Sequence, residues 1–207
     1  MSMKFIGGSL CLDFVNTVGG RAGQRAYTVL RDKLPTFDDL LTWSRLAGLV
    51  SQADVRRLER RAAGNSKEAA VVLKRAVVLR EGLYRIFRSV VDGRRTVRND
   101  IEILERELSI ARDHERLSPA AGAFVWTWDD RDALDRMLWA VSPSAAELLT
   151  SDDLSKLRHC GGEECGWMFL DTSRNRSRQW CDMRDCGNRA KVRRFRERRQ
   201  RAGVRTS

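Results

Sequence analysis

The sequence predicts a mainly α domain with a small β element (α+β), followed by a C-terminal module of four cysteines that ends in a basic helix. Apolar residues between positions 36 and 112 recur every three to four residues, a short aromatic stretch alternates with period two, and four of the five cysteines lie close together near the C-terminus. With 207 residues and 42% hydrophobic content, the chain can bury one sizeable core plus a small appendage. We expect domains at residues 1–153 and 154–207.

The first elements follow from turn and capping signals. Residues 5–20 (FIGGSLCLDFVNTVGG) hold an apolar run between two glycine pairs, which predicts an extended or turn-led entry into the domain. Thr36 with Asp39, and Ser51 with Asp54, have the spacing of capping boxes. We therefore expect helices to begin at these two places.

Two longer helices are expected next. Asn65 followed by Glu68 predicts the start of a helix that runs to about residue 91, and another is expected over about 97–112, ended by the Ser118-Pro119 region. The first of these carries a single apolar stripe, which predicts one buried face. The stripe consists of Ala69, Leu73, Ala76, Leu83, Phe87 and Val90.

The segment FVWTW at 124–128 alternates large apolar residues and predicts a β-strand, paired with the N-terminal apolar segment. Trp126 and Trp128 are then expected to pack in the core rather than to stack on bases. Helix is predicted again over 129–141, with Pro143 interrupting it or opening the next helix at its first turn.

Charge is concentrated near the C-terminus. From Lys156 onward there are 15 Lys or Arg and 6 Asp or Glu, a net charge of +9, whereas residues 1–155 hold 24 basic and 22 acidic residues, a net charge of +2. Clustered cations bind phosphate backbones by releasing counterions, so this asymmetry predicts a polyanion-binding end joined to an ordinary globular part. A solvated basic tail that aids solubility is the alternative.

No apolar run approaches the length of a membrane span, and the N-terminus lacks the pattern of a secretory signal. We expect a soluble cytoplasmic protein with no membrane partner, in which thiols stay reduced and disulfides are disfavoured.

The cysteines form two similarly spaced pairs. Cys160 and Cys165 are separated by four residues, as are Cys181 and Cys186, and fifteen residues lie between the pairs. Four thiolates in this arrangement can close a tetrahedral structural Zn²⁺ site. Cys11 lies far away in an apolar run and is expected to be a small buried hydrophobe.

The sequence gives less support to other roles for these four cysteines. Two disulfides require an oxidising compartment, and a catalytic metal would keep one coordination position open for water. His159 is an alternative ligand beside Cys160, and an iron-sulfur cluster would sit poorly in a polar, arginine-rich loop.

The stretch from Cys160 to Arg199 resembles the CGNR zinc finger, named for the run Cys186, Gly187, Asn188 and Arg189. LDFVNT at 12–17 and SAAELLTS at 144–151 resemble the ABATE domain that precedes this finger, whose family is described as a "putative stress-induced transcription regulator". The resemblance implies a zinc-binding regulator of transcription and spans almost the whole chain.

The residues after Cys186 predict a helix whose start is held by the metal, with Asn188 as its cap and only Val192 and Phe195 to anchor it. Such a helix suits a groove lined by phosphates, with Arg189 or Lys191 near base edges. The loop between the cysteine pairs would add phosphate contacts, while Asp171 bonds Arg178. The expected nucleic-acid contacts are Arg174, Arg176, Arg178, Arg189, Lys191, Arg193, Arg194, Arg196 and Arg198.

We therefore expect a regulator that binds duplex DNA through phosphate contacts, while the N-terminal domain senses a small-molecule effector or forms a homodimer. RNA or a ribosomal partner is the alternative, since the same charge and zinc would serve it. Asp13 and Asn16 are candidates for a ligand pocket. An enzyme is not expected, because neither these residues nor the acidic groups of WDDRD (128–132) join a nucleophile and a base.

Overall fold

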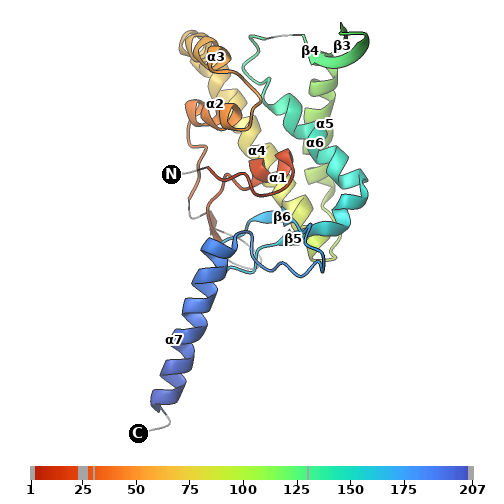
Figure 1. Ribbon diagram of the computed structural model, residues 1–207. Coiled ribbons are helices and arrows are strands. Elements are labelled where there is room, and N and C mark those ends of the chain that lie inside the picture. Colours follow the sequence, from red (N-terminus) through yellow and green to blue (C-terminus); the bar gives the residue numbers. More distant parts are fainter. Residues whose placement is uncertain (1–2, 23–27, 30, 130, 205–207) are drawn as a thin grey trace.

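The computed structural model describes residues 3–22, 28, 29, 31–129 and 131–204. The long helix α4 (Ser66–Val91) crosses the body, with α5 (Arg98–His114) and α6 (Leu138–Thr150) on one side and α2 (Phe37–Leu46) and α3 (Gln52–Gly64) on the other (Figure 1). The short α1 (Leu10–Val15) lies between these groups, and α7 (Asn188–Val204) projects away from the body.

Three small antiparallel sheets of two strands each accompany the helices of the described residues. Two of them lie at opposite ends of the body, the β3–β4 hairpin at one end and β5–β6 beside the start of α7 (Figure 1). Their strands are β1 (Arg21–Ala22) with β2 (Thr28–Val29), β3 (Glu115–Ala120) with β4 (Ala123–Trp128), and β5 (Leu157–His159) with β6 (Met168–Leu170). A 3₁₀ turn, η1 (Asp152–Lys156), precedes β5, and a π-helical turn, η2 (Met183–Gly187), precedes α7. This is the expected mainly helical fold with a cysteine module at its C-terminal end.

The helix starts follow the capping signals. The Thr36 hydroxyl accepts a hydrogen bond from the Asp39 amide, and Ser51 does the same with Asp54, so both predicted capping boxes are confirmed. Helix α4 begins directly after Asn65, although the Asn65 side chain caps nothing and instead donates to the Arg61 carbonyl.

The predicted stripe of α4 faces the core. Ala69, Ala76, Leu83 and Phe87 are buried, while Leu73 and Val90 are partly buried against the same cluster. Met168 and Leu170 of β6 belong to that cluster too. The cysteine module is thus packed onto the main core and does not hang from a linker.

The N-terminal segment was wrongly predicted to be extended. Residues 10–15 form α1, whose Cys11, Leu12, Phe14 and Val15 are buried, because one helical turn surrounded by other helices can bury all of its sides. Cys11 is fully buried, as expected, and burial raises the pKa of its thiol to about 11.

The strand at 124–128 exists but pairs differently from the prediction. β4 pairs with β3, so that Leu117 lies opposite Trp126, and the segment at Ser118-Pro119 is strand rather than a helix end. Trp126 and Phe124 are exposed, at 69% and 68%, while Trp128 packs on Trp139 with ring centroids 5.8 Å apart. The core prediction therefore holds for Trp128 and is wrong for Trp126.

The predicted helix over 129–141 starts late. Residues 131–137 form bends and turns, α6 begins at Leu138, and Pro143 lies inside this helix rather than at its start. Within WDDRD, Asp129 pairs with Arg116 and Asp132 with Arg57, and Asp130 lies outside the described residues. Among the described residues, no helix combines the length and apolar character needed to span a membrane.

Candidate metal centre and basic helix

The β5–β6 hairpin positions the first two cysteines. Cys160 follows β5, and its amide donates to the Trp167 carbonyl at 2.8 Å, which closes the loop that carries Cys165. Gly166 has a φ of +69°, and a Cβ there would lie 2.6 Å from the Cβ of Arg21. Only glycine satisfies both the left-handed backbone and this close approach.

The second pair comes from the end of the following loop and from η2. The Cys181 amide points at the first pair and donates to Cys160 Sγ at 3.3 Å. Cys186 lies in η2, whose first turn is capped by the Asp182 carboxylate accepting from the Arg184 amide at 2.9 Å. The turn leads directly into α7, so the predicted basic helix begins two residues after the last cysteine.

The four sulfur atoms meet in one cluster, all within 4.8 Å of one another. Cys165 Sγ lies 3.5 Å from Cys181 Sγ, which lies 3.6 Å from Cys186 Sγ. A tetrahedral Zn²⁺ site with metal to sulfur bonds of about 2.3 Å has sulfur to sulfur edges of about 3.8 Å. The donor set and its spacing fit a zinc-binding finger.

Electrostatics favours a cation at this cluster. Hydrogen bonds from the thiols of Cys165 and Cys181 lower the pKa of Cys160 to about 2, while the shared contact with Cys160 raises the pKa of both Cys165 and Cys181. Thiolates this close repel one another and cannot all ionise unless a metal lies between them. A divalent cation would supply that charge.

Neighbouring groups also fit a thiolate site. Arg189 Nη2 donates to Cys186 Sγ at 3.2 Å and pairs with Asp185 at the same distance. A Cβ on Gly162 would lie 3.3 Å from Cys186 Sγ, so this glycine leaves room for the sulfurs.

The alternatives for the cysteines find less support. All five cysteines are free, and the sulfur separations far exceed the length of about 2.05 Å of a disulfide bond. His159 does not join the cluster: its Nε2 is buried without a hydrogen-bond partner among the described residues, and burial lowers the pKa of its ring to about 4.

The aromatic residues of the module pack around the cluster. Trp167 and Phe169 are buried with three of the cysteines, and Trp180 packs on them partly buried. The Trp167 indole N–H donates to the Val18 carbonyl at 2.7 Å, which joins the module to the N-terminal part.

The side chains of Asp13 and Asn16 make hydrogen bonds to backbone groups and do not form an evident ligand site. Asp13 accepts from the Gly7 amide at 2.8 Å. The buried Asn16 amide donates to the Met168 carbonyl and accepts from the Met168 amide, at 2.8 and 2.9 Å. Sequence reasoning noticed both residues but missed their partners, since 152 residues separate Asn16 from Met168.

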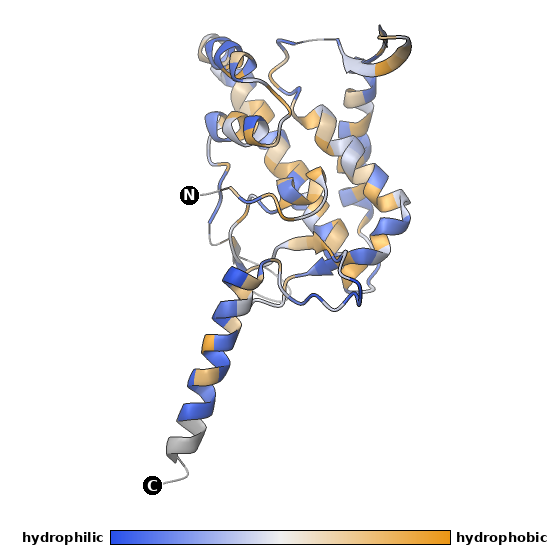
Figure 2. Ribbon diagram, viewed as in Figure 1, coloured by the Kyte–Doolittle hydropathy of each residue, from blue (hydrophilic) through white to orange (hydrophobic). Residues whose placement is uncertain are grey.

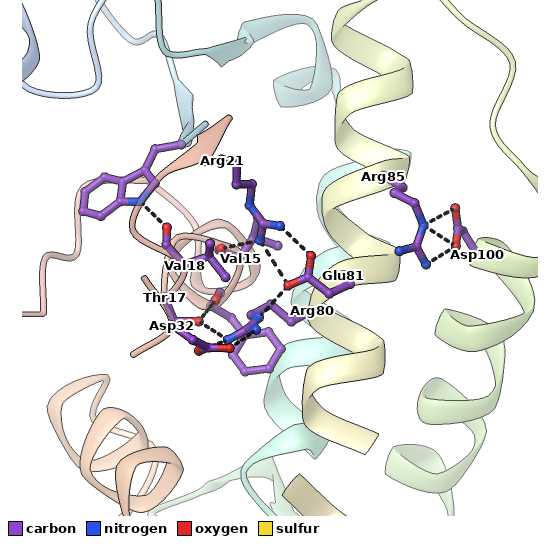
Figure 3. A network of polar contacts seen from close by, with 11 residues as sticks. Val15, Thr17, Val18, Arg21, Asp32, Arg80, Glu81, Arg85 and Asp100 are labelled. Atoms are coloured by element: carbon purple, nitrogen blue, oxygen red, sulfur yellow. Dashed lines mark hydrogen bonds and ion pairs between the residues drawn. The ribbon is translucent and has the colours of Figure 1, made fainter. Parts of the chain in front are cut away.

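Figure 3 shows a network of charged side chains around the buried Arg80, which was not predicted from the sequence. Arg80, 1% exposed, binds Asp32 with two hydrogen bonds of 2.7 Å and contacts Glu81 at 3.0 Å. Glu81 also pairs with Arg21, whose guanidinium lies 3.9 Å from the Tyr84 ring centroid. In the sequence, the charged residues Arg80 and Glu81 interrupt the apolar part of α4 between Leu79 and Leu83. This interruption was the one local sign of the network.

The predicted loop contacts divide into two kinds. Arg174 and Arg176 are exposed. Arg178 instead donates to the carbonyls of Trp180 and Cys181, and its guanidinium lies 4.4 Å from the Phe169 ring centroid. Asp171 does bond Arg178, but through the backbone amide at 2.8 Å rather than the guanidinium. The Arg178 side chain therefore stabilises the loop between the two cysteine pairs.

Helix α7 differs from its prediction at both its cap and its anchor. Asn188 has helical dihedrals and donates to the Arg184 carbonyl, so it does not cap the helix. Val192 and Phe195 are 50% and 60% exposed and do not anchor it. Ala190, in the first turn of α7 directly after η2, is buried and takes the place of the predicted anchor.

The predicted contacts on α7 also divide. Arg189 and Arg193 are engaged within the protein, the latter with Glu163 at 2.5 Å and Glu197 at 3.6 Å. The remaining four have no ion pair within the described part of the chain, and α7 stands clear of the body as a largely hydrophilic helix (Figures 1 and 2). These four are Lys191, Arg194, Arg196 and Arg198.

Two family models match the chain. Residues 156–199 match the CGNR zinc finger, and residues 8–152 match ABATE, described as "putative stress-induced transcription regulator". Among curated proteins, no sequence matches this chain.

Proposed function

Because the chain belongs to the ABATE family and carries a CGNR zinc finger, we propose that it is a transcription regulator that binds duplex DNA through α7, with a structural Zn²⁺ held by Cys160, Cys165, Cys181 and Cys186. The observation that carries the proposal is the attachment of a free-standing basic helix to the cysteine cluster: Cys186 lies two residues before the start of α7. We propose a binding protein rather than an enzyme.

The metal has a positioning role in this proposal. Zinc would tie η2 to the β5–β6 hairpin, because Cys160 and Cys165 come from the hairpin, Cys181 from the loop that follows it and Cys186 from η2. Eight Lys or Arg and one Glu occupy α7, so the helix presents a strong positive field to phosphates. The direction of the helix then depends on the metal.

The test combines elemental analysis with a salt series on duplex DNA. We expect about one zinc per chain, binding that falls steeply with salt, and loss of binding on chelation. Cys181→Ser should lose the metal, while Cys11→Ala, which removes the buried cysteine outside the cluster, should keep it. Zinc-loaded protein that does not bind duplex DNA at low salt would overturn the DNA assignment. Purified protein that contains no metal would overturn the zinc assignment.

RNA is the competing partner, and the same experiment separates the two. The deep, narrow major groove of duplex RNA does not admit a helix, so an RNA-binding role would require single strands or open loops. Preference for single-stranded or structured RNA over duplex DNA at equal salt would favour that role.

We propose that the N-terminal part mediates self-association through the β3–β4 hairpin. Leu117, Phe124 and Trp126 are exposed on one face of this two-stranded sheet, because cross-strand partners and every second residue share a face. The hairpin lies at the end of the body opposite α7 (Figure 1), so a second copy docked there leaves the basic helix free. We propose no effector site at Asp13 or Asn16, since their polar atoms hold backbone groups.

A further inference from the structure

Helix α7 has an inner and an outer side. Ala190 is buried against the module, and Arg193 reaches back to Glu163 and Glu197. At 100° per residue these positions share one side of the helix, and that side includes Glu197, the acidic residue of α7. The inner side is thus turned toward the protein and partly neutralised.

The outer side carries two apolar residues in water. Val192 and Phe195, three positions apart, share it and are 50% and 60% exposed. The guanidinium of Arg199 lies 5.8 Å from the Phe195 ring centroid on the same side. Lys191, Arg196 and Arg198 flank the pair, so an apolar centre has cations on both edges.

This arrangement fits a partner with an apolar spot on the floor of a groove and anionic walls. The major groove of duplex DNA has this chemistry, because it is wide enough for an α-helix, phosphates line its edges, and thymine alone of the four bases presents a methyl group there. Helix α7 is about 25 Å long at 1.5 Å per residue, which is enough to cross the groove.

We infer that the outer side of α7 enters the major groove, with Val192 and Phe195 contacting thymine methyl groups while Lys191, Arg196 and Arg198 contact phosphates. The inference rests on the proposed DNA binding and names the face of the helix that reads sequence. It differs from the expectation that Arg189 or Lys191 lies near base edges, since Arg189 is held by Cys186 and Asp185 and Lys191 is assigned here to a phosphate.

A membrane surface is the weaker fit for the same face. Helices that bind in the membrane interface bury a broad apolar face, whereas the described outer side of α7 offers Val192 and Phe195 among cations. The experiment below separates the two partners.

The test uses the full zinc-loaded chain and a duplex selected from a random library. Each thymine of the selected site is replaced in turn by deoxyuridine, which lacks only the methyl group. We expect at least one replacement to weaken binding about fourfold, the effect of one buried methyl-sized group. Phe195→Ala should bind the thymine duplex more weakly than the parent does. Its affinity should no longer change when thymine is replaced by deoxyuridine, and the slope of log K against log salt should stay the same.

Two controls keep the result specific. Val71→Ala trims a comparably exposed apolar residue, 58% exposed against 60% for Phe195, from a helix outside α7 and the β3–β4 hairpin, and it should keep the full response to deoxyuridine. Zinc content and helical circular dichroism of Phe195→Ala should match the parent, which shows that the helix still forms.

The outcomes are distinct for the inference and for the proposed function. Duplex binding with no response to deoxyuridine at any position, or with the full response kept in Phe195→Ala, overturns the inference and leaves DNA binding standing. Absence of duplex binding overturns both. Vesicles of anionic lipid that compete with the selected duplex in the parent but not in Phe195→Ala, without any thymine response, would reassign this face to membranes.

Discussion

Asn16, at the end of α1, and Met168, in β6, exchange two hydrogen bonds of 2.8 and 2.9 Å, so that a side-chain amide pairs with a strand as another strand would. The pair is buried, and the Leu170 amide extends the contact by donating to the Gly7 carbonyl at 2.8 Å. The N-terminal part and the cysteine module are therefore joined through backbone groups of the very hairpin that carries Cys160 and Cys165.

Asn16→Ala should destabilise both parts together. The change leaves the amide and carbonyl of Met168 buried without partners, at a cost on the order of 3 kcal/mol, and loosens the hairpin that presents two ligands. Chemical denaturation should show the loss, and a zinc indicator should show faster metal release. Asn65→Ala, at an exposed helix start, should do neither.

Asp32→Asn should cost roughly 3 kcal/mol of unfolding free energy, because it leaves the Arg80 guanidinium buried with Glu81 as its remaining carboxylate. Arg98→Met, which breaks the exposed pair with Glu102, should change stability by less than about 0.5 kcal/mol. Equal effects in the two variants would mean that the network of Figure 3 does not stabilise the fold.

The capping box of α3 should weaken in acid. Hydrogen bonds from the Ser51 hydroxyl and amide lower the pKa of Asp54 from 3.8 to about 2. Because the pKa is lower in the folded state, the stabilisation is complete above about pH 4 and is lost as the pH falls through 2. The stability difference between the parent and Asp54→Asn should therefore shrink between pH 5 and pH 2.5, and a constant difference would contradict this.

Removing cations from the outer side of α7 should change the salt dependence of DNA binding. Each lost phosphate contact reduces the slope of log K against log salt by about 0.9, so Lys191→Ala with Arg198→Ala should reduce it by about 1.8. Arg60→Ala with Lys67→Ala removes the same two residue types from the exposed surface of α3 and α4 and should leave the slope unchanged.

Trp126→Ser should shift the full chain toward monomer in sedimentation experiments, because it removes the largest apolar side chain from the exposed face of the β3–β4 hairpin. Val71→Ala, which trims an exposed apolar residue of α4, is the matched control and should leave self-association unchanged. A parent protein that stays monomeric at high concentration would remove the hairpin from the proposal.

The features that the sequence alone determined are local. The capping boxes at Thr36 and Ser51 act over three residues, and the apolar stripe of α4 follows from helical periodicity. The spacing of the cysteines predicted their gathering, because a metal site closed by two short loops needs little information from the rest of the chain. The attachment of α7 to the last cysteine followed from the same proximity.

Outside the stripe of α4, the tertiary structure decided which side chains face inward. Local pattern could not show that Asn16 pairs with a strand 152 residues away, that Arg80 is buried against Asp32, or that Trp126 and Phe195 point to water. An apolar residue is buried only when another element covers it, and a polar residue can be buried only when a partner meets it. Both conditions depend on contacts between distant parts of the chain, and these contacts set the outer side of α7 apart from its inner side.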